Sequence, residues 1–183
     1  MATITGNTLV GVYPKALVDA RYEQTDTPAS STILTGLQAR PGDVSLDNMG
    51  GEWLYAKATT ACAQYALCTI SGAAVPLAAE ATTTTIANGP VKLGIPQVAV
   101  AAGDFGWFWR GPGGAVGSGI KVLAANAALD VTLYTTGTPG VVDDANVDES
   151  VVSGLKLTAT VTTQAGVECL ASTLLTCNLG EPD

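Results

Sequence analysis

Short runs of alternating apolar and polar side chains recur along most of the chain after Gly50. Residues 53–58 read Trp-Leu-Tyr-Ala-Lys-Ala, and comparable runs follow as far as residue 179. Glycine, proline, asparagine or aspartate separates the runs, which is typical of strands joined by tight turns. The pattern predicts an all-β fold: an antiparallel β-sandwich or barrel of about ten short strands, with an extended N-terminal arm.

Particular strands are expected at residues 64–70, 166–171 and 174–179, among others. A helical period is not sustained anywhere, although residues 124–129 could form one helical turn. The glycine-rich stretch 111–119 cannot hold a strand and is expected to be a mobile loop.

One glycine-led phrase occurs twice, sixty residues apart. Gly94 opens an alternating run and Gly106 opens the next one, twelve residues later. Gly154 and Gly166 open two runs with the same interval. The phrase indicates that one arrangement of strands is used twice.

A second matching pair lies upstream of these two copies. Residues 65–70 end at Gly72, and residues 131–136 end at Gly137, 65 residues further on. The pairs indicate either an ancient duplication or the general likeness of glycine-punctuated strands. Both interpretations predict the same all-β fold.

The first 45 residues differ from the rest of the chain. Pro14, Pro28 and Pro41 are spread through them, and neither a helical nor a strand period is sustained. We therefore expect residues 1–45 to be an extended arm and residues 46–183 to be the β-rich core. The arm carries isolated apolar side chains that only a neighbouring molecule would bury, and we predict that these contact a partner: Leu9, Val10, Val12, Tyr13, Leu17 and Val18.

Composition and charge narrow the range of partners. Hydrophobic residues make up 47% of the chain and charged residues 13%, about half the usual share, which suits a protein that buries much of its surface against other subunits. The net charge is −8 and the eight cations are scattered, so we expect neither nucleic-acid nor membrane binding. The first residues lack the features of a signal peptide, which predicts synthesis in a cytoplasm. The four cysteines are then expected to be free thiols packed in the core.

The residues that carry chemistry are scarce. The chain has no histidine, which excludes nucleophile–histidine catalysis, and it has no phosphate-binding loop with a lysine. The acidic stretch 143–149 could coordinate calcium, but it lacks the spacing of a calcium loop, so a solvated turn is favoured. Acidic residues such as Asp47 stand beside turn formers, where capping explains them. We therefore expect no enzymatic activity, no metal and no cofactor.

Five aromatic residues are candidates for a core or a subunit interface: Trp53, Tyr55, Trp107, Phe108 and Trp109. In a strand, Trp107 and Trp109 share one face and Phe108 takes the other. Tryptophan pairs either fill a core or stack on sugars in a cleft, and the scarcity of aromatics here favours packing.

Several segments together resemble the head decoration, or cement, proteins of tailed bacteriophages. The likeness is one of pattern and covers roughly residues 45–180; it is carried by residues 50–58, 94–107, 133–140 and 154–157. The resemblance implies a β-rich protein that forms a homotrimer on the outer capsid surface and binds the major capsid protein, often through an arm. It implies no catalytic residues.

We therefore expect a structural virion protein, made in the bacterial cytoplasm, that stabilises the assembled head. The alternative is a carbohydrate- or receptor-binding module, similar to a tail-fibre tip, with Trp107 and Trp109 stacked on a host surface glycan.

Overall fold

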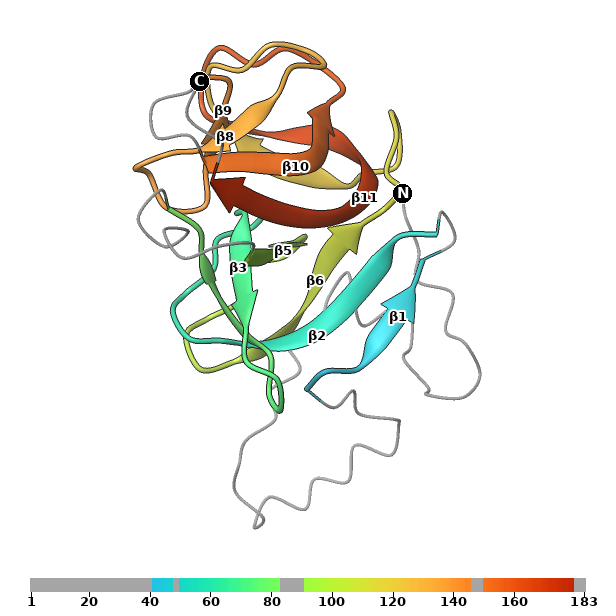
Figure 1. The fold of residues 1–183 in the computed structure, drawn as a ribbon, viewed down its shortest axis with the longest axis vertical. Helices are drawn as coiled ribbons and strands as arrows, with labels where there is room; N and C mark the ends of the chain where they lie inside the picture. The colour runs from blue at the N-terminus through green and yellow to red at the C-terminus, as the bar shows by residue number, and fades with distance from the viewer. Residues whose placement is uncertain (1–40, 48–49, 83–90, 146–149, 180–183) are drawn as a thin grey trace.

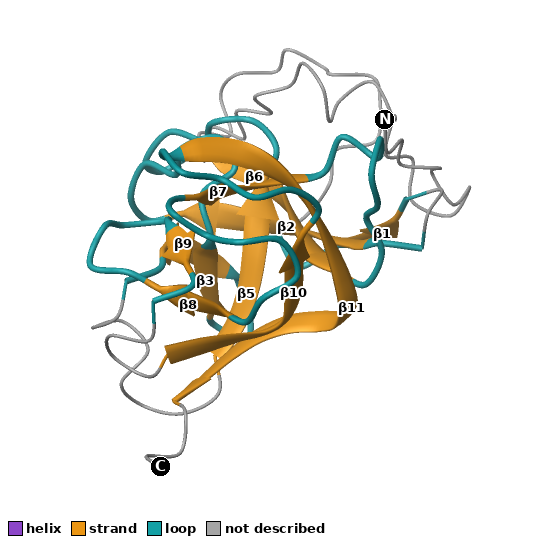
Figure 2. Ribbon diagram, turned by 90° about the horizontal axis from the view of Figure 1, so that it is seen from above, coloured by secondary structure: helices purple, strands orange, loops and turns teal. Residues whose placement is uncertain are grey.

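The computed structural model describes residues 41–47, 50–82, 91–145 and 150–179, and within these ranges it contains eleven β-strands and no helix (Figures 1 and 2). The predicted all-β class is confirmed. In the described part of the chain there is accordingly no helical segment able to cross a membrane. The strands are β1 (Val44–Leu46), β2 (Glu52–Ala58), β3 (Cys68–Ser71), β4 (Leu77–Glu80), β5 (Val91–Pro96), β6 (Phe105–Gly111), β7 (Lys121–Ala124), β8 (Leu133–Thr135), β9 (Val142–Asp143), β10 (Ser150–Leu157) and β11 (Ala165–Leu179).

Five strands close into a barrel, which we call the first ring. Their cyclic order is β2-β4-β3-β5-β6, with β6 returning to β2. All of these pairs are antiparallel except β2–β4, in which Lys57 lies opposite Leu77 and the strands run parallel. The ring is thus antiparallel, as the sequence predicted, except at the β2–β4 pair. Period-2 alternation does not reveal strand direction, since parallel and antiparallel strands have the same period.

The later strands repeat this arrangement and form a second ring, which lies above the first in Figure 1. Their cyclic order is β7-β9-β8-β10-β11, and β11 returns to β7. Again one pair is parallel, β7–β9, and it occupies the place of β2–β4 in the first ring. The repeated glycine phrase thus coincides with a repeated strand topology.

The agreement extends to the connections. After β2, Cys62 forms an antiparallel bridge with Val100 in the β5–β6 connection; after β7, Ala127 bridges Val161 in the β10–β11 connection. A tyrosine and an aspartate that lie 65 residues apart also share an uncommon backbone conformation, with φ of 69° at Tyr65 and 59° at Asp130. This offset is the one that relates Gly72 to Gly137 in the sequence.

The two copies of the glycine phrase meet different steric needs. An added Cβ at Gly94 would lie 2.9 Å from the Cβ of Phe108, so this glycine lets β5 pass close to β6. Gly154 instead has φ of 84° and stands where the β10–β11 register shifts between Ser153 and Leu155. The corresponding glycines therefore have different roles: Gly94 permits a close approach of two strands in the first ring, and Gly154 permits a bulge in the second.

Two buried clusters fill the molecule. One contains only residues of the first ring and its connections, among them Leu54, Ala56 and Phe108. The other contains the alternate side chains of the same strands, such as Trp53 and Trp109, together with buried residues of the second ring. Because neighbouring positions of β2 belong to different clusters, both faces of this strand are buried.

Some predicted elements differ in extent. The strands expected at 166–171 and 174–179 are one continuous strand, β11, which runs for 15 residues. The strand expected at 64–70 begins only at Cys68, because residues 64–65 form a turn. Residues 124–129 form no helical turn: β7 ends at Ala124, and Asn126 has a φ of 46°. The expected arm boundary at residue 45 falls within β1.

Candidate interaction surface

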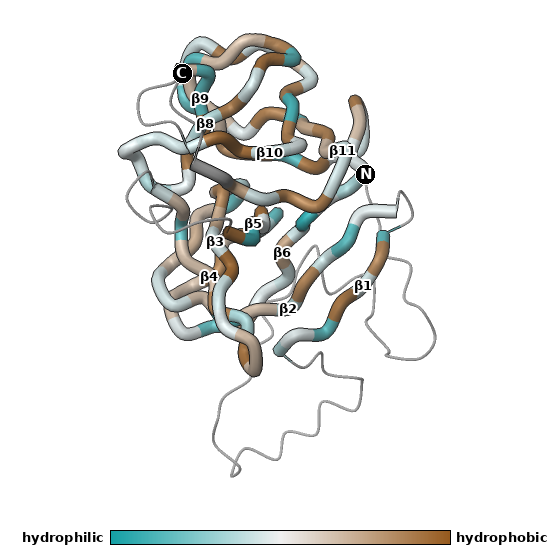
Figure 3. Tube along the Cα trace, viewed as in Figure 1, coloured by the Kyte–Doolittle hydropathy of each residue, from teal (hydrophilic) through white to brown (hydrophobic). Residues whose placement is uncertain are grey.

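The first described strand, β1, lies at an edge of the sheet and exposes apolar side chains. It pairs with β2 through Val44–Leu54, Ser45–Trp53 and Leu46–Glu52. Among the described residues no strand pairs with its other edge. Val44 and Leu46 are 53% and 55% exposed, whereas Ser45 between them is buried. Figure 3 shows β1 at the side of the molecule with two hydrophobic segments. We call Val44 and Leu46 the β1 strip.

Asp47 fixes the end of this strand. Its Oδ1 accepts a hydrogen bond from the Gly51 amide at 2.7 Å, and its Oδ2 accepts one from Trp53 Nε1 at 3.0 Å. An added Cβ at Gly51 would lie 2.5 Å from both Asp47 Oδ2 and Trp109 Nε1, so only glycine fits there. The turn role expected for Asp47 is confirmed. Since Asp47 is itself buried, β1 is held in place up to its last residue.

A strand edge of this kind offers two means of association. The backbone groups on its outer edge, which pair with no described strand, can bind an extended segment by adding a strand to the sheet. Its exposed apolar side chains gain free energy when a partner covers them. Val44 and Leu46 were not singled out in the sequence, because their run is only three residues long and straddles the predicted boundary between arm and core. The alternation Val44-Ser45-Leu46 after Pro41-Gly42 was the available signal.

The five predicted aromatic residues all lie in the interior, each at most 5% exposed. Trp107 and Trp109 belong to one cluster and Phe108 to the other, which confirms that they point to opposite faces of β6. Tyr55 packs against Trp107 with ring centroids 5.2 Å apart. A ring buried to this degree offers no free face for stacking on a sugar.

The predicted arm contacts, Leu9, Val10, Val12, Tyr13, Leu17 and Val18, lie outside the described residues.

The described part of the acidic stretch caps backbone groups. Asp143 Oδ1 accepts from the Ala145 amide at 3.1 Å, and Asp144 Oδ2 accepts from the Ala128 amide at 2.9 Å. Burial raises the pKa of Asp143 above its ordinary value, which opposes the charged form. Within the described ranges, no group of three or more acidic, cysteine or histidine residues is placed to hold a metal ion. These contacts agree with an acidic turn.

The cysteines are packed as core residues. All four are buried, and none forms a disulfide. Burial raises the pKa of Cys169 and also that of Cys177, the latter to about 12. A hydrogen bond between Cys62 and Cys68 lowers the pKa of Cys62 and raises that of Cys68. Apart from Cys62, the thiols are held in their neutral form, which is unreactive.

Comparison with known proteins gives no relative: no family model, no curated protein and no solved structure matches this chain.

Proposed function

We propose that this chain is a structural protein of a bacteriophage virion, which binds the outer surface of the assembled capsid as a homotrimer and stabilises the head. The observation that supports the proposal most directly is the β1 strip. An edge strand with 53% and 55% exposed apolar side chains stands at the point where the predicted arm joins the core. A capsid subunit that covers this strip and pairs with the edge would continue the contact made by the arm.

Charge and composition agree with this assignment. A net charge of −8 suits the outer face of a capsid, away from packaged DNA, because negative charges repel phosphate groups. Few charged residues must be desolvated when subunits meet. The interior position of Trp107 and Trp109 leaves the carbohydrate-binding alternative without the stacking platform that it requires.

The stabilising effect follows from binding linkage. A protein that binds only the assembled, expanded lattice lowers the free energy of that state by RT ln(1 + [L]/Kd), about 4 kcal/mol at a thousandfold excess over Kd. Three attachment points in one trimer multiply weak contacts, since the second and third bind at high effective concentration. Each contact can therefore be modest while the attachment as a whole is firm.

Co-sedimentation with undecorated heads of the phage that encodes the chain tests the proposal. We expect the protein to pellet with expanded heads and to remain in the supernatant with unexpanded ones. The variant Val44→Ser/Leu46→Ser should bind about tenfold more weakly or worse, because two apolar side chains lose their burial.

Exposed apolar residues outside β1 provide a matched control. Val75→Ser/Leu129→Ser removes the same two residue types at exposed positions, 41% and 54%, outside β1. This control should bind heads like the wild type. Equal weakening of both variants would remove the special role of β1, and the absence of any binding to heads, with glycan-array binding instead, would overturn the virion proposal.

A further inference from the structure

The open mouth of the first ring holds a pocket of about 650 Å³. It lies where β3 and β6 end and β5 begins, and its apolar wall includes Leu54, Ile70, Pro76 and Val91. Pockets of this size at the mouths of β-barrels are common places for small ligands or side chains to bind. The pocket is separate from the β1 strip, whose residues do not line it.

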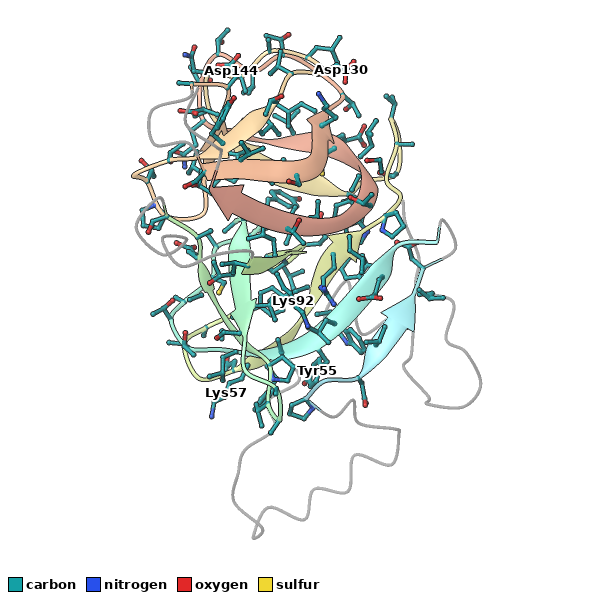
Figure 4. All side chains as sticks on the ribbon, in the orientation of Figure 1. Tyr55, Lys57, Lys92, Asp130 and Asp144 are labelled. Carbon is teal, nitrogen blue, oxygen red and sulfur yellow. The ribbon has the colours of Figure 1, made fainter. Side chains whose placement is uncertain are left out.

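Two cations face into this mouth because of strand register. Lys92 lies opposite Ile70, so it shares the inward face of that residue. Arg110 lies two residues after Phe108 on β6, and Phe108 belongs to the cluster inside the first ring. Both cations line the pocket, and Figure 4 shows the Lys92 side chain in the space between β5 and β2.

Arg110 is buried but incompletely satisfied. It is only 9% exposed, and its Nη1 donates to Glu52 Oε1 at 2.7 Å. Its Nε is buried and has no hydrogen-bond partner among the described residues. A guanidinium carries five donors, and a buried donor without an acceptor costs free energy. Arg110 lines the pocket, so an acceptor group that enters it would meet this cation.

Lys92 adds a second charge at the same mouth. Its side chain is exposed and makes no ion pair with any other described residue. With Glu52 counted, the three groups carry a net charge of +1, that is +1 and +1 from the cations and −1 from the carboxylate. One unit of positive charge matches a carboxylate, whereas a phosphate group carries up to two negative charges at neutral pH.

We propose that the mouth of the first ring binds a carboxylate carried on an apolar stem, with Arg110 and Lys92 on the carboxylate and the apolar wall on the stem. A planar carboxylate suits the planar guanidinium. A partner peptide offers this chemistry in an acidic side chain or a free C-terminus. This chain offers it as well, in Glu181 and Asp183. The strand that precedes them, β11, pairs with β5 at Val91, in the pocket wall.

The probe is 4-methylpentanoate, a carboxylate on a branched apolar stem, and the control compound is its uncharged amide analogue, 4-methylpentanamide. Saturation-transfer NMR on the full chain should show binding of the acid and at least tenfold weaker binding of the amide. Lys92→Gln should weaken acid binding about fivefold, as expected for one exposed ion pair. Lys156→Gln, which removes a half-buried lysine from the second ring, should leave acid binding unchanged.

The variant Glu52→Gln/Arg110→Gln removes both members of this partly buried ion pair, so that neither charge is left without its partner, and it should abolish binding. A chain ending at Leu179 separates the two sources of carboxylate. Tighter acid binding by the shortened chain would place its own Glu181 or Asp183 in the pocket, and unchanged binding would assign the pocket to a partner.

Three results would overturn the proposal: no binding of the acid to either form of the chain, equal binding of acid and amide, or displacement of the acid by inorganic phosphate at lower concentration. None of these outcomes depends on capsid attachment, so the pocket and the proposed virion function fail or stand separately.

Discussion

Glu168 on β11 positions the loop at residues 111–119, in which the sequence predicted no strand. Its two carboxylate oxygens accept hydrogen bonds from the amides of Gly117, at 2.9 Å, and Gly119, at 3.2 Å. These bonds, that to Gly117 foremost, lower the pKa of Glu168 below its ordinary value of 4.5. Gly113 is tied to Ala171 by a further pair of backbone bonds. Residues 111–119 contain no strand beyond the end of β6, as predicted, but one side chain and one bridge hold them against β11.

We predict that Glu168→Gln speeds amide exchange at Gly117 and Gly119 about tenfold at pH 7, because a neutral amide accepts more weakly than a carboxylate. The folded-state pKa is lowered, so the contribution of Glu168 is present above pH 4.5 and is lost as the pH falls through the lowered value. After correction for intrinsic exchange, the wild type should therefore approach the variant only in acid.

Glu80→Gln is the matched control. Glu80 Oε1 also accepts from a backbone amide, that of Ala63 at 2.7 Å, but in the first ring. Glu80→Gln should leave amide exchange at Gly117 and Gly119 unchanged. If Glu168→Gln also leaves amide exchange at these glycines unchanged, the loop is held by other contacts.

At the scale of elements, the sequence predicted most strands because both rings are built from alternating runs with glycine at their ends. It also indicated the repeat, since Gly94 and Gly154 open corresponding strands, β5 and β10, although for different steric reasons. The sequence could not indicate which strands pair with each other. The parallel pairs β2–β4 and β7–β9 join strands that are separated in the chain by another strand, and the residues of these strands do not indicate which strand each will pair with.

The candidate surfaces were harder to predict than the fold. Val44 and Leu46 form an exposed strip only because β1 pairs on one side, and a run of three residues is too short to establish a period. Lys92 and Arg110 are 18 positions apart in sequence, and they meet at one mouth only when the first ring has closed. Both surfaces depend on tertiary pairing.

The position of β1 sharpens a prediction about the arm. We expect deletion of residues 2–40 to leave the core folded, because the strands of both rings begin at Glu52 or later, and to weaken attachment to heads. Deletion of residues 2–47 should also lower the melting temperature, because it removes Asp47 and its bonds to Gly51 and Trp53. Circular dichroism melts of the two variants check this. An unfolded 2–40 deletion would show that the arm belongs to the core, and unchanged attachment would refute its role as a clamp.

At the scale of the whole molecule, we predict a homotrimer in solution. A chain with 47% hydrophobic and 13% charged residues gains from burying further apolar surface between subunits, with few charges to desolvate. Multi-angle light scattering at micromolar concentration should give three times the protomer mass. If the trimer forms through the β1 strip, Val44→Ser/Leu46→Ser will dissociate it. A strip reserved for the capsid predicts an intact trimer in that variant, and a stable wild-type monomer would contradict the prediction altogether.

The long strand β11 has a consequence for how the chain is made. It completes the second ring by pairing with β7 and β10, and its later part pairs with β5 of the first ring. During translation the last strand of the first ring is complete at Gly111, but β11 is synthesised last among the described strands. A product released before Ala165 retains uncovered edges on β7 and β10, and such edges join other chains. Premature termination would thus yield fragments prone to aggregation. Proteases of the cell would have to degrade these fragments before they pair with full-length chains.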